Sequence, residues 1–269
     1  MKSDKIAILG GGNIGTSLAK GLLNSKQFIP DNILVTDKDE SRINHLKSLG
    51  IKASADNLKA VASADIVVMS VKPQQFAKLG LEIKDNTNGK LVISTITGVS
   101  FRNIEEILGQ GPMVRIMPNT ALEICESMTC ISFMNTNPDL ERLVISLFGK
   151  LGQTVVIPEE LMNAATVIGA CGIAFALRFM RAMSQGGIEI GFNAEMAQLI
   201  SAQTIRGAAS LIIKTENHPE KEIDKVTTPQ GITISGLNEM EHQGLSSSVI
   251  RGLITSFNKL ENMVSKSGK

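Results

Sequence analysis

The sequence has few of the side chains that bind metal ions or form disulfides. Its 269 residues include three histidines and three cysteines, Cys125, Cys130 and Cys171. These residues show no spacing typical of metal ligands, so no built-in metal site is expected. An odd number of cysteines in apolar surroundings predicts reduced, buried thiols and a cytoplasmic location.

Net charge and long apolar runs are lacking as well. The 27 basic and 26 acidic residues leave a net charge of +1, which gives no support to a nucleic-acid or polybasic membrane partner. The longest apolar run, Ala164–Leu177, has 14 residues. A membrane-spanning helix needs about 20, so this run predicts a buried core helix. The apolar run at the N-terminus is too short for a signal peptide, and we expect a soluble protein.

What the sequence does contain is an alternation of strand-like and helical stretches up to residue 159. Near-continuous runs of β-branched residues predict strands buried on both faces, in a parallel sheet between helices. After residue 159 the composition turns to Ala, Met, Ile and Gly at helical spacing. We therefore predict an α/β domain over residues 1–159 and an all-helical domain over residues 160–269.

A glycine loop lies between the first predicted strand and the first predicted helix. In "IAILGGGNIG", Gly10, Gly12 and Gly15 form a G-x-G-x-x-G pattern, with Asn13 and Ile14 opening the helix. The first glycine permits a tight turn, the second lets a pyrophosphate approach the backbone, and the third allows close packing of helix on strand. The loop predicts a Rossmann-type dinucleotide-binding domain over residues 1–159.

The end of the second predicted strand bears on the choice of dinucleotide. Asp37 lies 22 residues after Gly15, where an acid would hydrogen-bond the ribose hydroxyls of NAD. Lys38 and Arg42 follow and could instead bind the 2′-phosphate of NADP. A turn residue is the alternative interpretation of Asp37, and the cofactor is predicted as NADPH or NADH.

The stretch "SVKP" ends another predicted strand. Val71, Lys72 and Pro73 therefore lie at the edge where open α/β sheets bind ligands. The proline forces an extended backbone before it, which could present main-chain groups to the cofactor. An ordinary exit from the strand is the alternative.

Several motifs occur in an order that resembles the pyrroline-5-carboxylate reductase family. They are "GGGNIG", "SVKP", "STITGVS", "RIMPNT", "TENHP" and "DKVTTPQGITISGL". The resemblance covers nearly the whole chain, and the last motif is the most specific. It implies reduction of the C=N bond of 1-pyrroline-5-carboxylate to L-proline, the last step of proline biosynthesis, with NADPH or NADH. It also implies that the helical domain binds substrate and intertwines with a second subunit, in a homodimer or higher homo-oligomer.

The resemblance also assigns residues to the site. Those expected at the cofactor, together with Asp37 and Lys38, are Gly10, Gly12, Asn13, Ile14, Gly15, Asn57, Val71, Lys72, Pro73, Ile96, Thr97, Gly98 and Asn119. Those expected at the substrate are Glu216, Thr228, Gly231, Ile232 and Thr233. Backbone N–H groups of "GITI" with the Thr228 hydroxyl would bind the carboxylate. Thr233 is the catalytic candidate, because it could hydrogen-bond the imine nitrogen. The alternative is that both threonines merely cap the following helix.

Two departures from the family pattern stand out. The family's G-S-G-P-A-Y appears here with Cys171, Ile173 and Phe175 in place of serine, proline and tyrosine. The polar roles of those side chains are therefore absent. In "TPQG", Gln230 replaces the first of two glycines, and it would be strained if that position needs a positive φ.

Other functions make different demands on the sequence. A two-domain 3-hydroxyacid dehydrogenase needs an acid–base lysine on the first long helix of the second domain. Residues 161–183 contain no lysine or histidine, and a ketoacid reductase meets the same difficulty. A catalytically silent NAD(P)-binding sensor or scaffold is the alternative from a different class.

The apolar helical domain predicts at least a homodimer, with contacts through residues 187–213.

Overall fold

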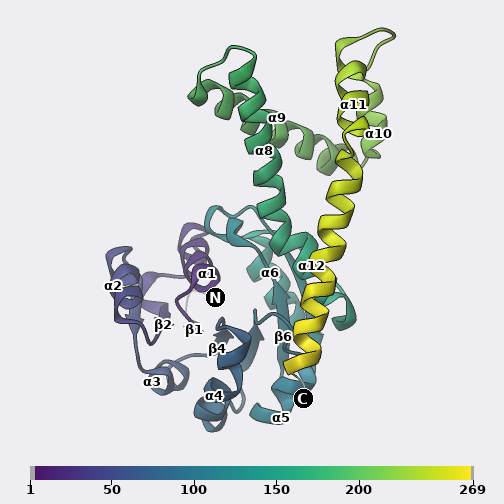
Figure 1. Cartoon of the computed structure of the whole chain (residues 1–269). Helices are drawn as coiled ribbons and strands as arrows, with labels where there is room; N and C mark the ends of the chain where they lie inside the picture. Colours follow the sequence, from purple (N-terminus) through teal and green to yellow (C-terminus); the bar gives the residue numbers. More distant parts are fainter. Residues whose placement is uncertain (1–3, 268–269) are drawn as a thin grey trace. The chain divides into compact units, whose positions relative to one another are not determined.

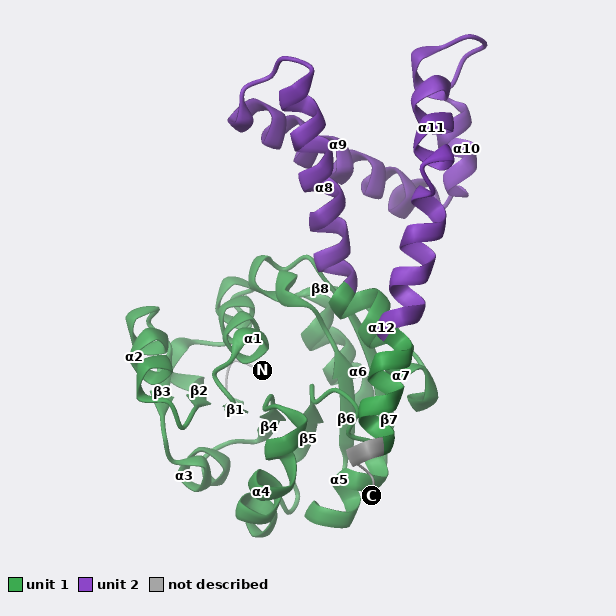
Figure 2. Cartoon of the chain, in the orientation of Figure 1, with its two compact units in different colours: residues 1–171, 257–269 green, residues 172–256 purple. Residues whose placement is uncertain are grey.

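The protein divides into two compact units in a computed structural model that describes residues 4–267, with side chains through residue 265 (Figure 2). Unit 1 contains the residues up to Cys171 together with those from Phe257 on, and unit 2 is Gly172–Ser256. Unit 1 is an α/β fold and unit 2 is helical, which confirms the predicted fold class. The predicted domain boundary at residue 159 precedes this division, and the return of the C-terminal residues to unit 1 was not predicted.

A β-sheet forms the centre of unit 1 (Figure 1). It has eight strands in the order β3-β2-β1-β4-β5-β6-β7-β8. Its strands are β1 (Ile6–Leu9), β2 (Ile33–Thr36), β3 (Lys52–Ser54), β4 (Ile66–Met69), β5 (Leu91–Ser94), β6 (Met113–Met117), β7 (Ser127–Met134) and β8 (Gly152–Val156). Neighbouring strands are parallel except β6 and β7, which are antiparallel. Every residue of β1, β4, β5 and β6 is buried, as expected for strands covered on both faces.

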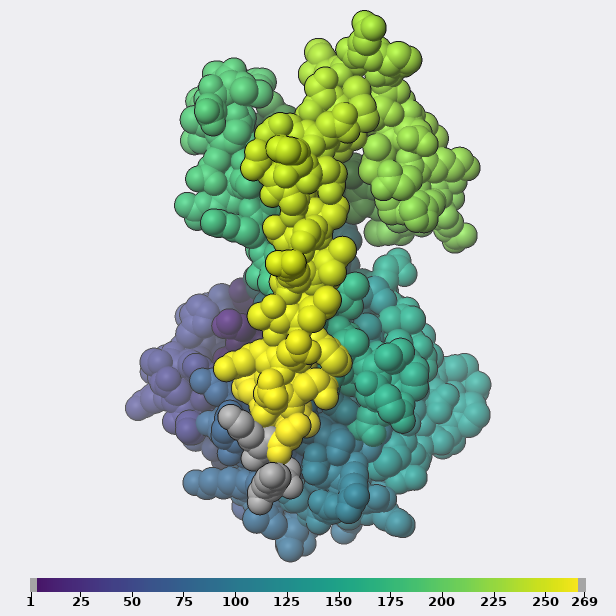
Figure 3. Space-filling view, turned by 45° about the vertical axis from the view of Figure 1, so that its right-hand side comes forward, coloured from purple at the N-terminus to yellow at the C-terminus, as the bar shows by residue number. Residues whose placement is uncertain are grey.

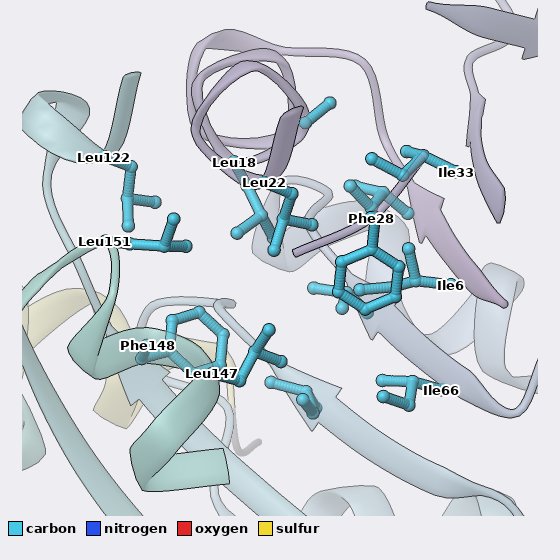
Figure 4. Packing of buried hydrophobic residues seen from close by; sticks show 14 of the residues in the cluster. Ile6, Leu18, Leu22, Phe28, Ile33, Ile66, Leu122, Leu147, Phe148 and Leu151 are labelled. Atoms are coloured by element: carbon cyan, nitrogen blue, oxygen red, sulfur yellow. The ribbon is translucent and has the colours of Figure 1, made fainter. Parts of the chain in front are cut away.

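Helices cover both faces of this sheet. They are α1 (Asn13–Asn24), α2 (Glu40–Ser48), α3 (Asn57–Ala62), α4 (Pro73–Ile83), α5 (Phe101–Leu108), α6 (Pro138–Gly149) and α7 (Met162–Ala165), with 3-10 turns η1 (Pro30–Asn32), η2 (Lys84–Asn86), η3 (Thr120–Ile124) and η4 (Glu159–Leu161) and a π-helix η5 (Thr166–Cys171). One core joins α1 to α6 through Leu18, Leu22 and Phe148 (Figure 4). A second core, around Phe76 and Phe101, lies under α3, α4 and α5. With both faces covered, the strand ends are left for ligands.

The C-terminal part of α12 (Leu245–Ser267) packs on the rest of unit 1. The Asn163 side chain donates a hydrogen bond to Glu261 Oε1 at 2.8 Å. Val264 lies against the loop after β5, where a Cβ atom added to Gly98 would be 2.7 Å from Val264 Cγ2. Gly98 also has φ +74°, so only glycine fits there without strain. The yellow end of this helix lies on the surface of unit 1 in Figure 3.

Unit 2 buries few of its residues. Its helices are α8 (Gly172–Glu189), α9 (Ala194–Thr215), α10 (Pro219–Asp224), α11 (Ile232–His242) and the first part of α12. Asn193 caps α9, since its side chain accepts from Met196 N at 2.8 Å. Of the predicted buried core helix over residues 164–177, only residues 165–167 are buried, Ile168 is 68% exposed and α8 buries none, so the prediction is wrong from Ile168 on. Several large apolar side chains of unit 2 are exposed to solvent, among them Ile190 at 79% and Leu199 at 70%.

One helical stretch among the described residues is long and apolar enough to cross a membrane. It is Glu159–Glu189, with a mean hydropathy of 1.6 in its most apolar window. It exceeds the 14-residue run seen in the sequence because helix continues on both sides of that run. Core helices of soluble proteins meet the same criterion, so length and composition do not by themselves identify a membrane span.

The three cysteines are free thiols. Cys130 is buried, and burial raises the pKa of its thiol. Cys125 and Cys171 are only partly buried, so the prediction of buried thiols is right for Cys130 alone.

Candidate active site

A cavity of about 890 Å³ opens in unit 1 where β1, β2, β4 and β5 end at their carboxyl termini. This is the edge at which open parallel sheets bind ligands. The predicted cofactor residues that line it are Gly10, Gly12, Asn13, Ile14, Asp37, Lys38, Asn57, Val71, Lys72, Pro73 and Thr97. Residues from the first, second, fourth and fifth strand ends therefore meet in one cavity.

The glycine loop brings α1 close to the end of β1. Gly10 has φ +114°, and a Cβ atom there would lie 2.3 Å from the Ser70 carbonyl oxygen. A Cβ atom at Gly15 would lie 1.9 Å from the Gly10 carbonyl oxygen. Gly12 is the N-cap of α1 and makes no side-chain cap hydrogen bond. The N–H groups of the first turn are thus free of a side-chain cap beside the cavity, an arrangement that suits a phosphate group.

The Asp37 carboxylate is fixed at the end of β2. Its Oδ2 accepts from Gly11 N at 2.9 Å, and its Oδ1 accepts from Asp39 N at 3.0 Å. The guanidinium of Arg42 lies 3.5 Å from Oδ2, and the Asp37 side chain is only 9% exposed. Asp39 also lines the cavity, and hydrogen bonds from the Ser41 hydroxyl and backbone N–H hold the pKa of its carboxyl below the usual range.

Asn57 links three elements beside Asp37. Its side-chain oxygen accepts from Thr36 Oγ1 at 2.6 Å, and its amide nitrogen donates to Glu82 at 3.1 Å. The amide therefore joins β2 and α4 from the first residue of α3.

Sequence analysis missed Ser70 and Thr95 as cavity residues. Each directly follows a buried parallel strand, and their hydroxyls lie 3.1 Å apart. Their positions in the sequence could have identified them, because the first polar residue after a parallel strand lies at the ligand-binding edge of the sheet.

Some residues with an implied cofactor role lie outside the cavity lining, namely Gly15, Ile96, Gly98 and Asn119. Gly15 allows close packing on the Gly10 backbone, and Gly98 leaves room for the Val264 side chain. Ile96 belongs to the buried core. The Asn119 side chain accepts from Ala121 N at 3.0 Å and donates to the Gly169 carbonyl at 3.1 Å. Its amide is therefore committed to internal hydrogen bonds that hold η3 and the π-helix.

The residues predicted at the substrate belong to unit 2. Thr228 to Gly231 form a β-turn, closed by a 2.9 Å hydrogen bond from Gly231 N to the Thr228 carbonyl. A Cβ atom on Gly231 would lie 2.5 Å from Thr228 Oγ1, so glycine permits this close approach. Gly231 is the N-cap of α11 without a side-chain cap, so neither threonine caps this helix. Ile232 and Thr233 follow as its first residues, and Ile232 is 95% exposed.

Two non-glycine residues in this region have left-handed backbones. Glu216 ends α9 with φ 55°, and Gln230 has φ 58° at the third position of the turn. The strain anticipated for Gln230 is therefore present, because a Cβ atom disfavours this conformation by about 1–2 kcal/mol.

Gln230→Gly is expected to raise the free energy of unfolding by about 1 kcal/mol, since glycine adopts a positive φ without steric cost. Denaturant unfolding at a fixed protein concentration measures it. The matched control is Gln243→Gly, at a position with φ −78°, where glycine should lower stability. A loss of stability in Gln230→Gly would contradict strain at this turn.

The part of the chain that the structure describes, residues 4–267, contains no group of three or more His, Cys, Asp or Glu residues that could hold a metal ion.

Two family models match the chain. Residues 159–263 match the model described as pyrroline-5-carboxylate reductase dimerisation. Residues 5–98 match the one described as NADP oxidoreductase, coenzyme F420-dependent. The first covers all of unit 2 and α12 as far as residue 263. The second covers the strands whose ends form the cavity.

Individual proteins match over nearly the whole chain. Pyrroline-5-carboxylate reductase 2 of Dictyostelium discoideum is 40% identical, over 96% of this chain and 93% of its own. Pyrroline-5-carboxylate reductase 1 of the same organism is 43% identical, and the match spans only 49% of that longer protein. Among solved structures, Plasmodium falciparum pyrroline carboxylate reductase with NADP bound has a TM-score of 0.90 at 26% identity, and covers 98% of this chain and 99% of its own.

Proposed function

The chain belongs to the pyrroline-5-carboxylate reductase family, and we propose that it reduces the C=N bond of 1-pyrroline-5-carboxylate to give L-proline, with NADPH or NADH as reductant. The observation that carries the proposal is the 40% sequence identity to a relative with that name, over 93% of its length. The cavity and the α11 N-terminus supply groups whose chemistry suits the cofactor and the substrate.

The cavity in unit 1 fits a dinucleotide. Gly10 and Gly15 allow the close packing described above, and the uncapped first turn of α1 would bind the pyrophosphate. Asp37 would accept from the adenosine ribose, and Thr97 and Val71 would line the remaining part of the cavity. When bound, the reduced nicotinamide supplies the hydride.

The N-terminus of α11 offers donors without a cation, which suits a small carboxylate. Its first N–H groups have no side-chain cap, and the Thr228 hydroxyl makes no hydrogen bond to any residue that the structure describes. We assign the carboxylate to these groups, with Gly231, Ile232 and the Glu216 side chain around the ring. Thr233 would hydrogen-bond the imine nitrogen and hold the ring in orientation, which demands less than a strong general acid.

We further propose a homodimer or higher homo-oligomer through unit 2, in the cytoplasm, without a nucleic-acid or membrane partner. The match to a dimerisation model over residues 159–263 supports this assembly. So do the exposed apolar side chains on α8 and α9, including Phe179, Leu199 and Ile213, because soluble proteins rarely leave large apolar surfaces open.

Loss of reduced-nicotinamide absorbance on mixing purified protein with 1-pyrroline-5-carboxylate and NADH or NADPH tests the activity. Formation of proline, identified by mass spectrometry, completes the assay. Cofactor binding without turnover for either dinucleotide would contradict the reductase and support a silent sensor or scaffold.

Thr233→Val is expected to lower kcat roughly 10- to 100-fold, the effect of losing one hydrogen bond to a reacting group, with unchanged cofactor affinity. The matched control is Thr227→Val, which removes a hydroxyl that donates only to the carbonyl of Asp224, the last residue of α10. Unchanged turnover in Thr233→Val would remove the role assigned to Thr233.

A further inference from the structure

The cavity carries a carboxylate where dinucleotide-binding folds bind the adenosine ribose. NADH and NADPH differ only at this ribose. NADH presents a 2′-hydroxyl, which can donate a hydrogen bond, whereas NADPH presents a 2′-phosphate with a charge of about −1.5 to −2 and only acceptor oxygens. The inference below rests on the proposed function, because it concerns the same cofactor.

The Asp37 carboxylate cannot easily turn away from an approaching ligand. Each of its oxygens accepts a backbone N–H, from Gly11 at 2.9 Å and from Asp39 at 3.0 Å. The first bond ties it to the glycine loop and the second to the residue that caps α2. Since a carboxylate has about four acceptor sites, Asp37 keeps sites for a ribose hydroxyl. It has nothing to donate to a phosphate.

The nearby cations do not offset this charge. Arg42 Nη1 lies 3.5 Å from Asp37 Oδ2, and its Nε lies 3.9 Å from Asp39 Oδ2, so two carboxylates share one guanidinium. The segment 37–42 holds three acids against two bases, a formal charge of −1. A 2′-phosphate that paired with Arg42 would take this cation away from Asp37. The phosphate would then face a fixed carboxylate that has lost its ion-pair partner. Lys38 is exposed and would be the remaining cation.

We infer that Asp37 makes this protein selective for NADH over NADPH. The Plasmodium falciparum protein solved with NADP shares 26% of its residues with this chain, and its ligand is a property of that protein. In this protein the acceptor oxygens of Asp37 suit the two hydroxyls of the NADH ribose, whereas their negative charge repels the 2′-phosphate of NADPH.

Direct titration of the purified protein with NADH and with NADPH, followed by the emission of the reduced nicotinamide, tests the inference without turnover. The chain has no tryptophan or tyrosine, so excitation of those residues does not contribute. We expect Kd for NADH to be at least about tenfold lower than for NADPH. In Asp37→Ser, NADH should weaken and NADPH should tighten, so that the ratio of the two Kd values shifts toward NADPH by about tenfold or more.

Glu40→Gln is the matched control. It removes a negative charge from the same segment at an exposed residue outside the cavity lining, and the ratio should stay within about twofold of the parent protein. If Asp37→Ser does not fold, Asp37→Asn keeps the shape of the side chain without its charge. The ratio of the two Kd values in the parent protein tests the inference without any variant. Tighter or equal binding of NADPH by the parent protein would overturn the inference and leave the reductase proposal standing. Binding of neither dinucleotide would overturn both.

Discussion

Replacing Glu159 by alanine is expected to lower the free energy of unfolding by about 3 kcal/mol, because it removes one partner of a largely buried ion pair. Glu159 Oε1 accepts from Arg115 Nη1 at 2.7 Å and from the backbone N–H of Phe101 at 2.6 Å. The Arg115 side chain is 6% exposed and that of Glu159 is 31% exposed. Alanine would leave a buried guanidinium without its carboxylate and the first N–H of α5 without an acceptor. The partial exposure of Glu159 places the loss at the lower end of the range for such pairs.

Denaturant unfolding measures this loss, at one protein concentration because assembly contributes to apparent stability. The adjacent Glu160→Ala is the control, since Glu160 is exposed and surface substitutions usually change stability by less than about 0.5 kcal/mol. Glu159→Gln should lie between the two, because it keeps an acceptor and loses the charge. A change below about 1 kcal/mol in Glu159→Ala would show that water solvates Arg115 in the variant.

This ion pair could not be predicted from the sequence. Arg115 is on β6 and Glu159 follows β8, and the two are 44 residues apart in the chain. No local pattern connects them. The pairing depends on the fold, which brings β6, η4 and the first residue of α5 together around the Glu159 carboxylate. The hydrophobic pattern of each strand was sufficient to predict β1, β4 and β5, because these are short apolar runs buried on both faces.

Two strands show the limits of the apolar pattern. β3 was not predicted, because Lys52–Ser54 has no apolar run and its backbone pairs with β2 alone. The antiparallel direction of β7 was not predicted either, because an apolar run carries no direction. The connection Pro118–Glu126 does contain a clue, since it is too short for the crossover that a parallel strand needs, about a dozen residues or more.

In the candidate site, the motif residues were predictable and their partners were not. The glycine loop and Asp37 follow from spacing, whereas the hydrogen bond from Gly11 to the Asp37 carboxylate forms only when β1 and β2 lie side by side. Gln230 is an intermediate case. Its sequence position allowed a conditional statement about strain, and its φ of 58° met the condition.

Gly15→Ala is expected to weaken NADH binding by about 100-fold or more and to lower stability by about 1–3 kcal/mol, the usual cost of overpacking. The added Cβ atom would lie 1.9 Å from the Gly10 carbonyl oxygen, a main-chain atom that no rotamer change can move. Either α1 or the glycine loop must shift, and the N–H groups at the start of α1 would shift with it. Circular dichroism, denaturant unfolding and NADH titration together measure the outcome.

Comparison with Gly12→Ala separates packing from contact with the ligand. Gly12 lines the cavity, and a Cβ atom there would meet only Arg42 Nη1, at 3.8 Å. That variant should keep the stability of the parent protein and lose affinity only because its methyl group obstructs the approach of a pyrophosphate. Gly149→Ala, with nothing within 4 Å of the added atom, controls for both effects. Parent-like NADH affinity in Gly15→Ala would mean that the loop adapts to the clash. The close packing of α1 on β1 would then not be what positions the N–H groups for the cofactor.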